Sequence, residues 1–328
     1  MCGILVKIAQ SGTIDPADFS AQLAMQSHRG PDGQSTWIAS DQSVAIGHNL
    51  LALTGTRNTQ QPFTNEDGRL IATVNGEFYG HEELRASLRN KGHLFRSDSD
   101  SEIALHLYEE YGEECLKFLR GEFAFAIWDI QKQKLFCARD RFGIKPLHYQ
   151  SNHEGLTIAS EAKVILSSKT SAHWDPNSLM RVFTHQYLAP DETLFQGIRQ
   201  LPPAHTLVHE NGRLKISRYW EPCTEFPSSI TPEEVLESLQ SSVLDRLHPE
   251  AAFSLSGGID SSAVVALASQ HLGKKVPAFS VSFDEAAYDE LNLINSTHQE
   301  IGATINPVKI TRHDLLEHLP EAVAMSEG

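Results

Sequence analysis

Met1-Cys2-Gly3-Ile4-Leu5-Val6-Lys7 opens the chain and places a cysteine directly behind the first methionine, ahead of a short apolar run that predicts a β-strand over Ile4–Ile8. A small second residue permits removal of Met1, which leaves Cys2 with both a thiol and a free α-amine. An amine with a pKa of about 8 can act as the base for the neighbouring thiol, directly or through water, so this nucleophile needs no histidine. A cysteine at position 2 can also be accidental, and the residues that follow decide between the two interpretations.

Length and composition favour an ordinary globular protein of two domains. The chain has 328 residues, 40% of them hydrophobic and 21% charged. It has no apolar run of the roughly 18 residues that a membrane span needs, and its start lacks the features of a secretory signal. We therefore expect a cytoplasmic protein without membrane contact. The formal net charge of −15 disfavours nucleic-acid binding, which needs a positive field.

The four cysteines give no sign of a zinc site or a redox pair, because none lies in a C-x-x-C pattern. Cys115 and Cys137 lie in apolar segments and are expected in the core.

The first two thirds of the chain alternate apolar strands with turns and a few helices. Strands are predicted at Ile4–Ile8, Val44–Leu53, Leu70–Val74, Phe123–Ile130, Leu135–Ala138 and Leu156–Ala159. Helices are predicted at Glu82–Lys91 and Glu102–Tyr111, each closed by a glycine. This density of strands predicts an α+β domain in which sheets pack face to face and helices cover them.

The pattern changes after Trp220. Residues 221–230 contain prolines and serines without periodicity and are interpreted as a linker. Thr231-Pro232-Glu233-Glu234 is a helix start. An apolar helical stripe follows it, made of Val235, Leu236, Leu239, Val243, Leu244 and Leu247.

From Ala251 onward strands and helices alternate. The predicted elements are a strand at Ala252–Leu255, a helix at Ser261–His271 capped by Gly273, a strand at Val276–Phe283 and a helix at Asp289–Ile301. This alternation predicts a parallel α/β sheet.

Five short segments of the first domain resemble, in order, the motifs of class II glutamine amidotransferases. They are Met1-Cys2-Gly3-Ile4, His28-Arg29-Gly30-Pro31-Asp32-Gly33, Asn75-Gly76-Glu77, Ser99-Asp100-Ser101-Glu102 and Arg139-Asp140-Arg141-Phe142-Gly143-Ile144-Lys145-Pro146-Leu147. The resemblance implies a fold like that of the N-terminal-nucleophile (Ntn) hydrolases and an amide-hydrolysing activity.

The resemblance also implies residue roles, and these fit the chemistry. Cys2 would be the nucleophile, while the Asn75 side-chain amide and the Gly76 backbone N–H would stabilise the oxyanion. The other glutamine-binding residues would be Leu51, Leu53, Glu77 and Asp100, with Asp100 accepting from the substrate's α-ammonium. The structural alternatives are a turn at Asn75-Gly76 and a helix cap at Ser99 or Asp100.

One position departs from the family. Its members carry an arginine, in a segment like G-H-x-R-L-S-I, that pairs with the α-carboxylate of glutamine, and the matching residue here is Leu50. A charged hydrogen bond of that kind is worth roughly 1.5–3 kcal/mol. Three alternatives follow: another group replaces it, with Arg57 the nearest candidate; glutamine binds weakly; or the amide donor differs.

The second half resembles the ATP pyrophosphatases. Leu255-Ser256-Gly257-Gly258-Ile259-Asp260-Ser261-Ser262 follows a predicted strand and opens a helix, as their S-G-G-x-D-S loop does. Backbone N–H groups and a helix N-terminus bind phosphate oxygens there, and the absence of G-K-[ST] excludes a Walker A loop. The resemblance implies ATP binding by Leu255, Ser256, Gly257, Gly258, Asp260, Ser261, Ser262 and Val281, with Asp260 a magnesium contact. Tyr288-Asp289-Glu290 matches a later (F/Y)-D-E segment.

Together the two halves resemble glutamine-dependent enzymes of the asparagine synthetase type. The expected domains are a glutaminase domain over 1–220, a linker over 221–230 and a truncated synthetase domain over 231–328, because the family's later S-G-(E/D)-G-(S/G)-D-E loop has no counterpart. The implied reaction uses glutamine, ATP, Mg²⁺ and a carboxylate acceptor, most simply aspartate. Glutamine hydrolysis itself needs no cofactor, and a homodimer is left open.

Four alternatives remain: amidation of another acid, glutaminase activity alone, a non-catalytic regulatory or interaction fragment, and a synthetase with an inactive glutaminase domain. Cys2 and Asn75-Gly76-Glu77 argue against the last of these.

Overall fold

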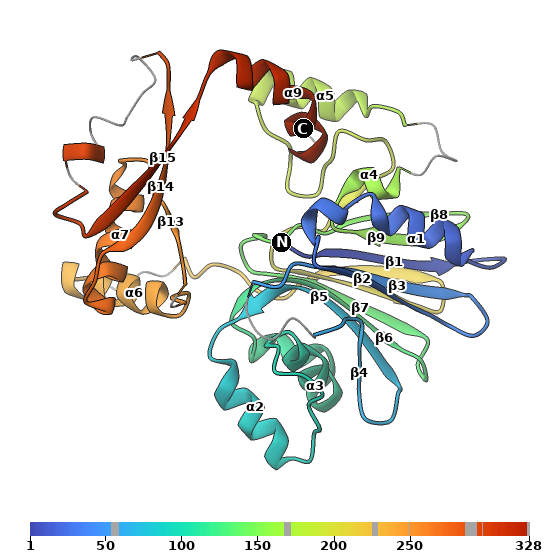
Figure 1. Cartoon of the computed structure of the whole chain (residues 1–328). Helices are drawn as coiled ribbons and strands as arrows, with labels where there is room; N and C mark the ends of the chain where they lie inside the picture. Colours follow the sequence, from blue (N-terminus) through green and yellow to red (C-terminus); the bar gives the residue numbers. More distant parts are fainter. Residues whose placement is uncertain are drawn as a thin grey trace. The chain divides into compact units, whose positions relative to one another are not determined.

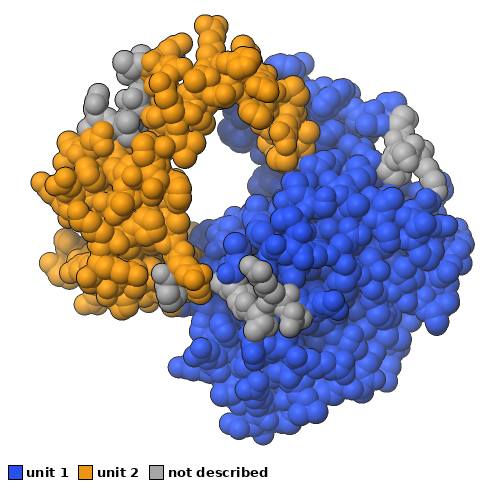
Figure 2. All heavy atoms as spheres, in the orientation of Figure 1, with its two compact units in different colours: residues 1–223, 327 blue, residues 224–326, 328 orange. Residues whose placement is uncertain are grey.

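The computed structural model describes residues 1–53, 59–166, 172–224, 229–248, 250–285, 294–296 and 298–326. Within these ranges the chain forms two compact units, Met1–Cys223 and Thr224–Ser326 (Figure 2). No helix among the described residues is both long and apolar enough to cross a membrane.

The first unit contains two six-stranded antiparallel sheets. The first sheet has the order β10-β8-β9-β1-β3-β2, with β10 Arg199–Gln200, β8 His148–Asn152, β9 Gly155–Ala159, β1 Gly3–Ala9, β3 Val44–Leu50 and β2 Gly33–Ile38. The second has the order β12-β11-β7-β6-β5-β4, with β12 Arg213–Arg218, β11 His205–Glu210, β7 Lys134–Arg139, β6 Gly121–Asp129, β5 Leu70–Phe78 and β4 Phe63–Thr64.

Helices cover the outer faces of the stacked sheets (Figure 1). On the first sheet lie α1 Pro16–Ala24 and α4 Ala162–Ile165, and on the second lie α2 His81–Asn90 and α3 Glu102–Tyr111. The short helices η1 Ser27–Arg29 and η2 Gly112–Lys117 and the helix α5 Pro176–His185 complete this unit's helices in the described ranges. The predicted α+β architecture of packed, helix-covered sheets is confirmed.

The strand period of two explains why the central strands are apolar throughout. Ile4 and Val6 of β1 point into the layer between the sheets, whereas Leu5 packs against Phe19 of α1 on the other side. In β6, Phe125 faces the helix layer and Ala124 faces the other sheet. Strands buried on both faces become continuous apolar runs, which made them easy to predict from sequence.

Most predicted elements of this unit are found, with some differences at their ends. The strand predicted to Leu53 ends at Leu50, because the Ala52 N–H donates to the Asp32 carboxylate (2.8 Å) and the chain leaves the sheet. The strand predicted to Val74 continues to Phe78. Helices α1 and α5 were not predicted, although Asp15 and Asp175 each cap a helix that begins with proline.

The second unit is built on a parallel sheet of the order β13-β14-β15, as the sequence predicts. Its described elements are α6 Pro232–Leu244, β13 Phe253–Ser254, α7 Ile259–Leu272, β14 Val276–Phe283, β15 Ala303–Ile310 and α9 Arg312–Ser326. Leu255, Val265 and Ala278 are among the residues of its small core. Helix α6 begins at the predicted start, where Thr231 and Glu234 form a capping box.

Two details of the second unit differ from the prediction. Of the helix predicted at Asp289–Ile301, residues 294–296 are helical, 298–301 form a turn, and 289–293 and 297 lie outside the described residues. The apolar stripe of α6 is also mainly exposed: Val243 is buried, whereas Val235 and Leu236 are about half exposed. The residues of the predicted linker that are described, 221–224 and 229–230, have neither helix nor strand.

The layered core of the first unit predicts the effect of a truncation there. Phe125 is fully buried and packs against the rings of Phe123 and Phe136, with centroids 5.5 and 5.8 Å away. Phe125→Ala should lower the free energy of unfolding by about 3–5 kcal/mol. Phe183→Ala, at a side chain that is 83% exposed, should change it by less than about 0.5 kcal/mol.

All four tryptophans lie in the first unit, at positions 37, 128, 174 and 220, so denaturant titration followed by tryptophan fluorescence reports on this unit alone. If Phe125→Ala and Phe183→Ala lowered the free energy of unfolding equally, the layered core would be contradicted.

Candidate active site

One pocket of the first unit gathers residues from segments far apart in the sequence. Its lining includes every residue that the sequence analysis assigned to catalysis or glutamine binding: Cys2, Leu51, Leu53, Asn75, Gly76, Glu77 and Asp100. Met1, Leu50, Ala52, Thr59, Gln61, Ser99, Ser101 and Lys145 complete the lining. The pocket lies where β1 begins, β3 ends and β5 passes.

Cys2 precedes β1 and is partly buried. Its Sγ accepts from the Leu51 N–H at 3.4 Å and lies 3.8 Å from the Leu51 carbonyl oxygen. Burial raises the pKa of the Cys2 thiol, so the thiolate needs a base to form at neutral pH. Burial also lowers the pKa of the chain's terminal amine, carried here by Met1, which enlarges the fraction of amine able to accept a proton.

The segment from His28 to Asp32 anchors this terminus. The Arg29 Nε donates to the Cys2 carbonyl oxygen at 3.1 Å, and its guanidinium pairs with Glu161 at 3.0 Å. Gly30 packs so tightly that a Cβ there would lie 2.4 Å from the Asn49 carbonyl carbon. The sequence marked this motif but gave Arg29 no role, and the structure makes it a positioning residue for Cys2.

Asn75 and Gly76 lie inside β5, opposite Ala124 and Phe123 of β6, so the alternative of a turn at this place is wrong. A Cβ on Gly76 would lie 2.4 Å from the Glu122 carbonyl oxygen, so only glycine fits. The Asn75 side chain is 1% exposed, and its Nδ2 has no hydrogen-bond acceptor among the described residues. A buried amide donor left without an acceptor is costly, and a substrate oxygen in the pocket would satisfy it.

Asp100 lies near the carboxyl end of the segment that connects α2 to α3. Its carboxylate accepts from the Phe78 N–H at 2.7 Å, and burial raises its pKa in spite of that bond. Helix α3 begins at Glu102, and Ser101 at its cap position makes no side-chain cap bond. The Ser99 hydroxyl accepts from the Ser101 N–H at 3.3 Å, so Ser99 makes a capping contact just ahead of the helix. Asp100 is therefore available to a ligand ammonium.

The motif from Arg139 to Leu147 forms a loop held by its own first two side chains. The Arg139 guanidinium donates to the carbonyl oxygens of Gly143, Lys145 and Leu201. The Asp140 carboxylate accepts from the Lys145 N–H, among others, at 3.0 Å. Burial lowers the pKa of Arg139 to about 10, which leaves it charged at neutral pH. Lys145, which belongs to this loop, lines the pocket.

Leu50 lines the pocket at the end of β3, as its alignment with the family arginine predicts, whereas Arg57 lies outside the described residues. Among the described lining residues, Lys145 is the only cationic side chain, and its Nζ lies 3.2 Å from the Glu122 carboxylate. Lys145 was not singled out from the sequence, because its motif gave no indication of which side chain faces the pocket.

In the second unit the predicted ATP-binding loop connects the carboxyl end of β13 to α7. Gly257 has a φ of +83°, which glycine adopts readily and other residues rarely do. Gly258 precedes the helix, and the Ser256 and Ser261 hydroxyl oxygens lie 3.1 Å apart. Asp260 is exposed in the first turn of α7, where N–H groups lack intrahelical acceptors.

The donor set of this loop fits a phosphate group with a hard cation beside it: hydroxyls, first-turn N–H groups and one exposed carboxylate. Ser262 follows on the helix, and Val281 is about half exposed on β14. Leu255 instead belongs to the core, and its N–H donates to the Phe279 carbonyl oxygen at 2.9 Å. The Tyr288-Asp289-Glu290 segment lies outside the described residues.

Comparison with known proteins finds a family for each of the two units. A family model described as a glutamine amidotransferase domain matches residues 1–220, and one described as asparagine synthase matches residues 234–328. Asparagine synthetase [glutamine-hydrolyzing] 3 of Bacillus subtilis is 33% identical over 100% of this chain and 57% of its own length. A putative asparagine synthetase [glutamine-hydrolyzing] of Mycobacterium bovis is 33% identical over 98% of this chain and 54% of its own length. The chain thus spans little more than half the length of these relatives.

Other relatives carry different names. Amidase chry2 of Gibberella zeae is 31% identical over 94% of this chain and 49% of its own length. Among solved structures, the glutamine phosphoribosylpyrophosphate amidotransferase of B. subtilis superposes with a TM-score of 0.52 at 16% identity, covering 94% of this chain and 81% of that one. At this identity the likeness concerns the fold alone, and it agrees with the expected Ntn-hydrolase-like architecture. The chain belongs to the asparagine synthetase family and carries a class II glutamine amidotransferase domain.

Proposed function

We propose that the protein is a glutamine-dependent amidotransferase in which Cys2 hydrolyses glutamine to glutamate and ammonia. The observation that carries this proposal is the buried Asn75 amide, which has no acceptor among the described residues and lines the same pocket as Cys2 and Asp100. A nucleophile, an oxyanion donor and an ammonium acceptor in one pocket are the requirements of this reaction.

The steps follow from these groups. The Cys2 amine, free after loss of Met1, takes the thiol proton, and the sulfur attacks the side-chain amide carbon of glutamine. The Asn75 Nδ2 and the Gly76 N–H donate to the resulting oxyanion. Its collapse transfers the proton to the leaving nitrogen, which releases ammonia and leaves a thioester on Cys2. Water activated by the same amine then hydrolyses the thioester to glutamate.

The proposal for the second unit is that the Ser256–Ser262 loop binds the phosphates of ATP with Mg²⁺ at Asp260. The whole protein would activate a carboxylate as an acyl-adenylate, releasing pyrophosphate, and ammonia would displace AMP to give the amide. Aspartate is the first candidate acceptor, because the first relatives are named asparagine synthetases. The relative named amidase chry2 favours a second candidate, an acid other than aspartate. The remaining parts of the proposal are a cytoplasmic location and a homodimer.

The nucleophile proposal predicts the state of the chain's terminus. The mature protein should lack Met1, because only then does Cys2 carry a free amine. A glutamine-like diazoketone should modify one residue per chain, Cys2, and leave the exposed Cys223 unmodified. Intact mass and peptide mapping measure both. An active enzyme that retains Met1 would rule out this mechanism.

Cys2→Ala should abolish glutaminase activity, and Asn75→Ala should lower kcat by roughly 10²–10³-fold with a smaller change in KM, because the lost bond forms only with the oxyanion. Cys223→Ala is the matched control and should keep wild-type rates. Ammonia release from glutamine is the measurement. Wild-type kcat in Asn75→Ala would exclude this amide from the oxyanion hole.

Because Leu50 stands in place of the family arginine, we expect weak glutamine binding. The α-carboxylate of glutamine is remote from the scissile bond, so the lost contact affects mainly KM. Leu50→Arg should lower KM by about 10- to 150-fold, the equivalent of roughly 1.5–3 kcal/mol. Steady-state kinetics of Arg57→Ala and Lys145→Met ask whether either cation has taken over the contact. A rise in KM for Leu50→Arg would mean that the pocket is built around another donor.

A further inference from the structure

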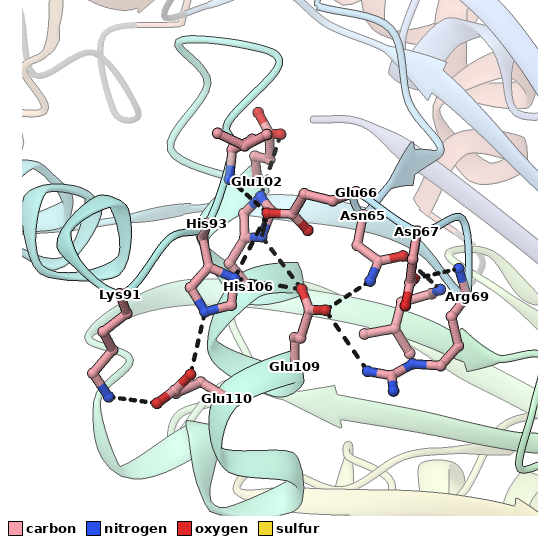
Figure 3. Close-up of polar contacts among 12 residues, drawn as sticks. Asn65, Glu66, Asp67, Arg69, Lys91, His93, Glu102, His106, Glu109 and Glu110 are labelled. Carbon is pink, nitrogen blue, oxygen red and sulfur yellow. Dashed lines mark hydrogen bonds and ion pairs between the residues drawn. The ribbon is translucent and has the colours of Figure 1, made fainter.

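Four side chains that can ligate a metal meet on the helix-covered side of the second sheet: Glu66, His93, His106 and Glu109 (Figure 3). We call them the His–Glu cluster. Glu66 lies in the turn between β4 and β5, and His93 follows α2. His106 and Glu109 lie one turn apart on the same face of α3. Three separate elements therefore converge on one point.

The four histidine-to-carboxylate distances within the cluster are close to, and mostly slightly longer than, those around a tetrahedral ion. The Nδ1 of His93 lies 3.4 Å from the Glu109 Oε2 and 3.8 Å from the Glu66 Oε1. The Nδ1 of His106 lies 3.7 Å from each of these two oxygens. Ligand bonds of about 2.0–2.2 Å at tetrahedral angles would put neighbouring ligand atoms about 3.3–3.6 Å apart. The observed distances also exceed the range of about 2.7–3.2 Å for N–H···O hydrogen bonds.

Outer carboxylates orient both imidazole rings. The His93 Nε2 lies 3.3 Å from the Glu110 carboxylate, and the His106 Nε2 lies 3.5 Å from the Glu102 carboxylate. Metal-binding histidines usually donate their second ring N–H to such a partner. With the proton on Nε2, each Nδ1 presents a lone pair to the oxygens of Glu66 and Glu109. Four electron-rich atoms then face one another.

Burial makes this arrangement costly without a cation. His106 is 0% exposed, and its Nδ1 makes no hydrogen bond to any described residue; the same holds for the buried Glu109 Oε2. The other contacts hold the carboxylates in place: the Leu94 N–H donates to Glu66 at 2.5 Å, and the Asn65 amide donates to Glu109 at 2.8 Å. Buried polar atoms without a partner call for an explanation, and a bound ion between these atoms supplies one.

We propose that Glu66, His93, His106 and Glu109 bind one divalent transition-metal ion, and that zinc is the ion that fits. Two imidazole nitrogens and two carboxylate oxygens in a tetrahedral arrangement match the ligands that zinc accepts. Four protein ligands leave no open position, so the site is structural rather than catalytic. The side chains of Glu66 and Glu109 are 25% and 19% exposed, which gives the ion a path from solvent.

The ion would stabilise the segment that carries Asp100. Residues 91–101 connect α2 to α3. This connection contains His93 near its start and is followed directly by Glu102, the first residue of α3. The Glu102 carboxylate, the outer partner of His106, accepts from the N–H groups of Arg96 and Ser97, both at 2.8 Å. The ion would thus link the β4–β5 turn, the connection and α3.

The test uses the full 328-residue chain, stripped with a chelator and titrated with Zn²⁺ and with Co²⁺. Wild type should bind one ion per chain, with the visible absorption of tetrahedral Co²⁺. His93→Gln and Glu109→Gln should weaken binding beyond the roughly 10- to 100-fold that loss of an outer partner costs, and Glu110→Gln should fall within that range. Glu113→Gln, whose carboxylate pairs with Lys134 at 2.7 Å outside the cluster, is the control and should bind as wild type does.

Stability supplies a second readout that does not depend on activity. Zinc should raise the Tm of wild type and of Glu113→Gln, measured by tryptophan fluorescence, but not that of Glu109→Gln. A cooperative thermal transition in the presence of chelator verifies that each variant is folded. If His93→Gln or Glu109→Gln does not fold, Glu66→Gln is used in its place. The proposal fails if wild type binds Zn²⁺ no more tightly than Glu109→Gln. It also fails if bound Co²⁺ shows the charge-transfer band of a thiolate, since a cysteine outside the cluster would then hold the ion.

Discussion

The packing of the two sheets against each other is the interaction on which the glutaminase unit depends. Ile4 and Val6 of β1, Ile46 of β3, and Ile71 and Ala124 of the second sheet share this layer. A one-residue slip of a strand would turn the side chains that are fitted to this layer to the opposite face of the sheet, so the packing of the layer opposes it. The register in turn sets where β1 begins, where β3 ends and which residues of β5 reach the pocket. Catalytic geometry is thus a consequence of core packing.

The sequence was most informative where apolar pattern or motif was strong. Strands with two buried faces were visible as apolar runs, and helix α3 was predicted with the bounds that it has. The motifs assigned seven residues that the fold brings into one pocket. The end of β3 was not predictable, because it depends on the carboxylate of Asp32, twenty residues before Ala52.

The roles of residues that act through backbone contacts could not be inferred from the sequence, although these residues lie in the quoted motifs. Arg29, Arg139 and Asp140 bind carbonyl or N–H groups, and such partners do not depend on residue type and cannot be read from a pattern. The His–Glu cluster shows the same limit. Only His106 and Glu109 have helical spacing, whereas Glu66 and His93 reach them through a turn and a connection whose paths are set by tertiary packing.

Arg29 holds the carbonyl of Cys2 rather than its amine, and this has a consequence for how the protein matures. The hydrogen bond from Arg29 to the Cys2 carbonyl can form whether or not a residue precedes Cys2. Removal of Met1 therefore requires no change in this contact. Unprocessed and processed chains should therefore be equally well folded and hard to separate by shape or stability. Under the proposed mechanism, the specific activity of a preparation would depend on the fraction of its chains that have lost Met1.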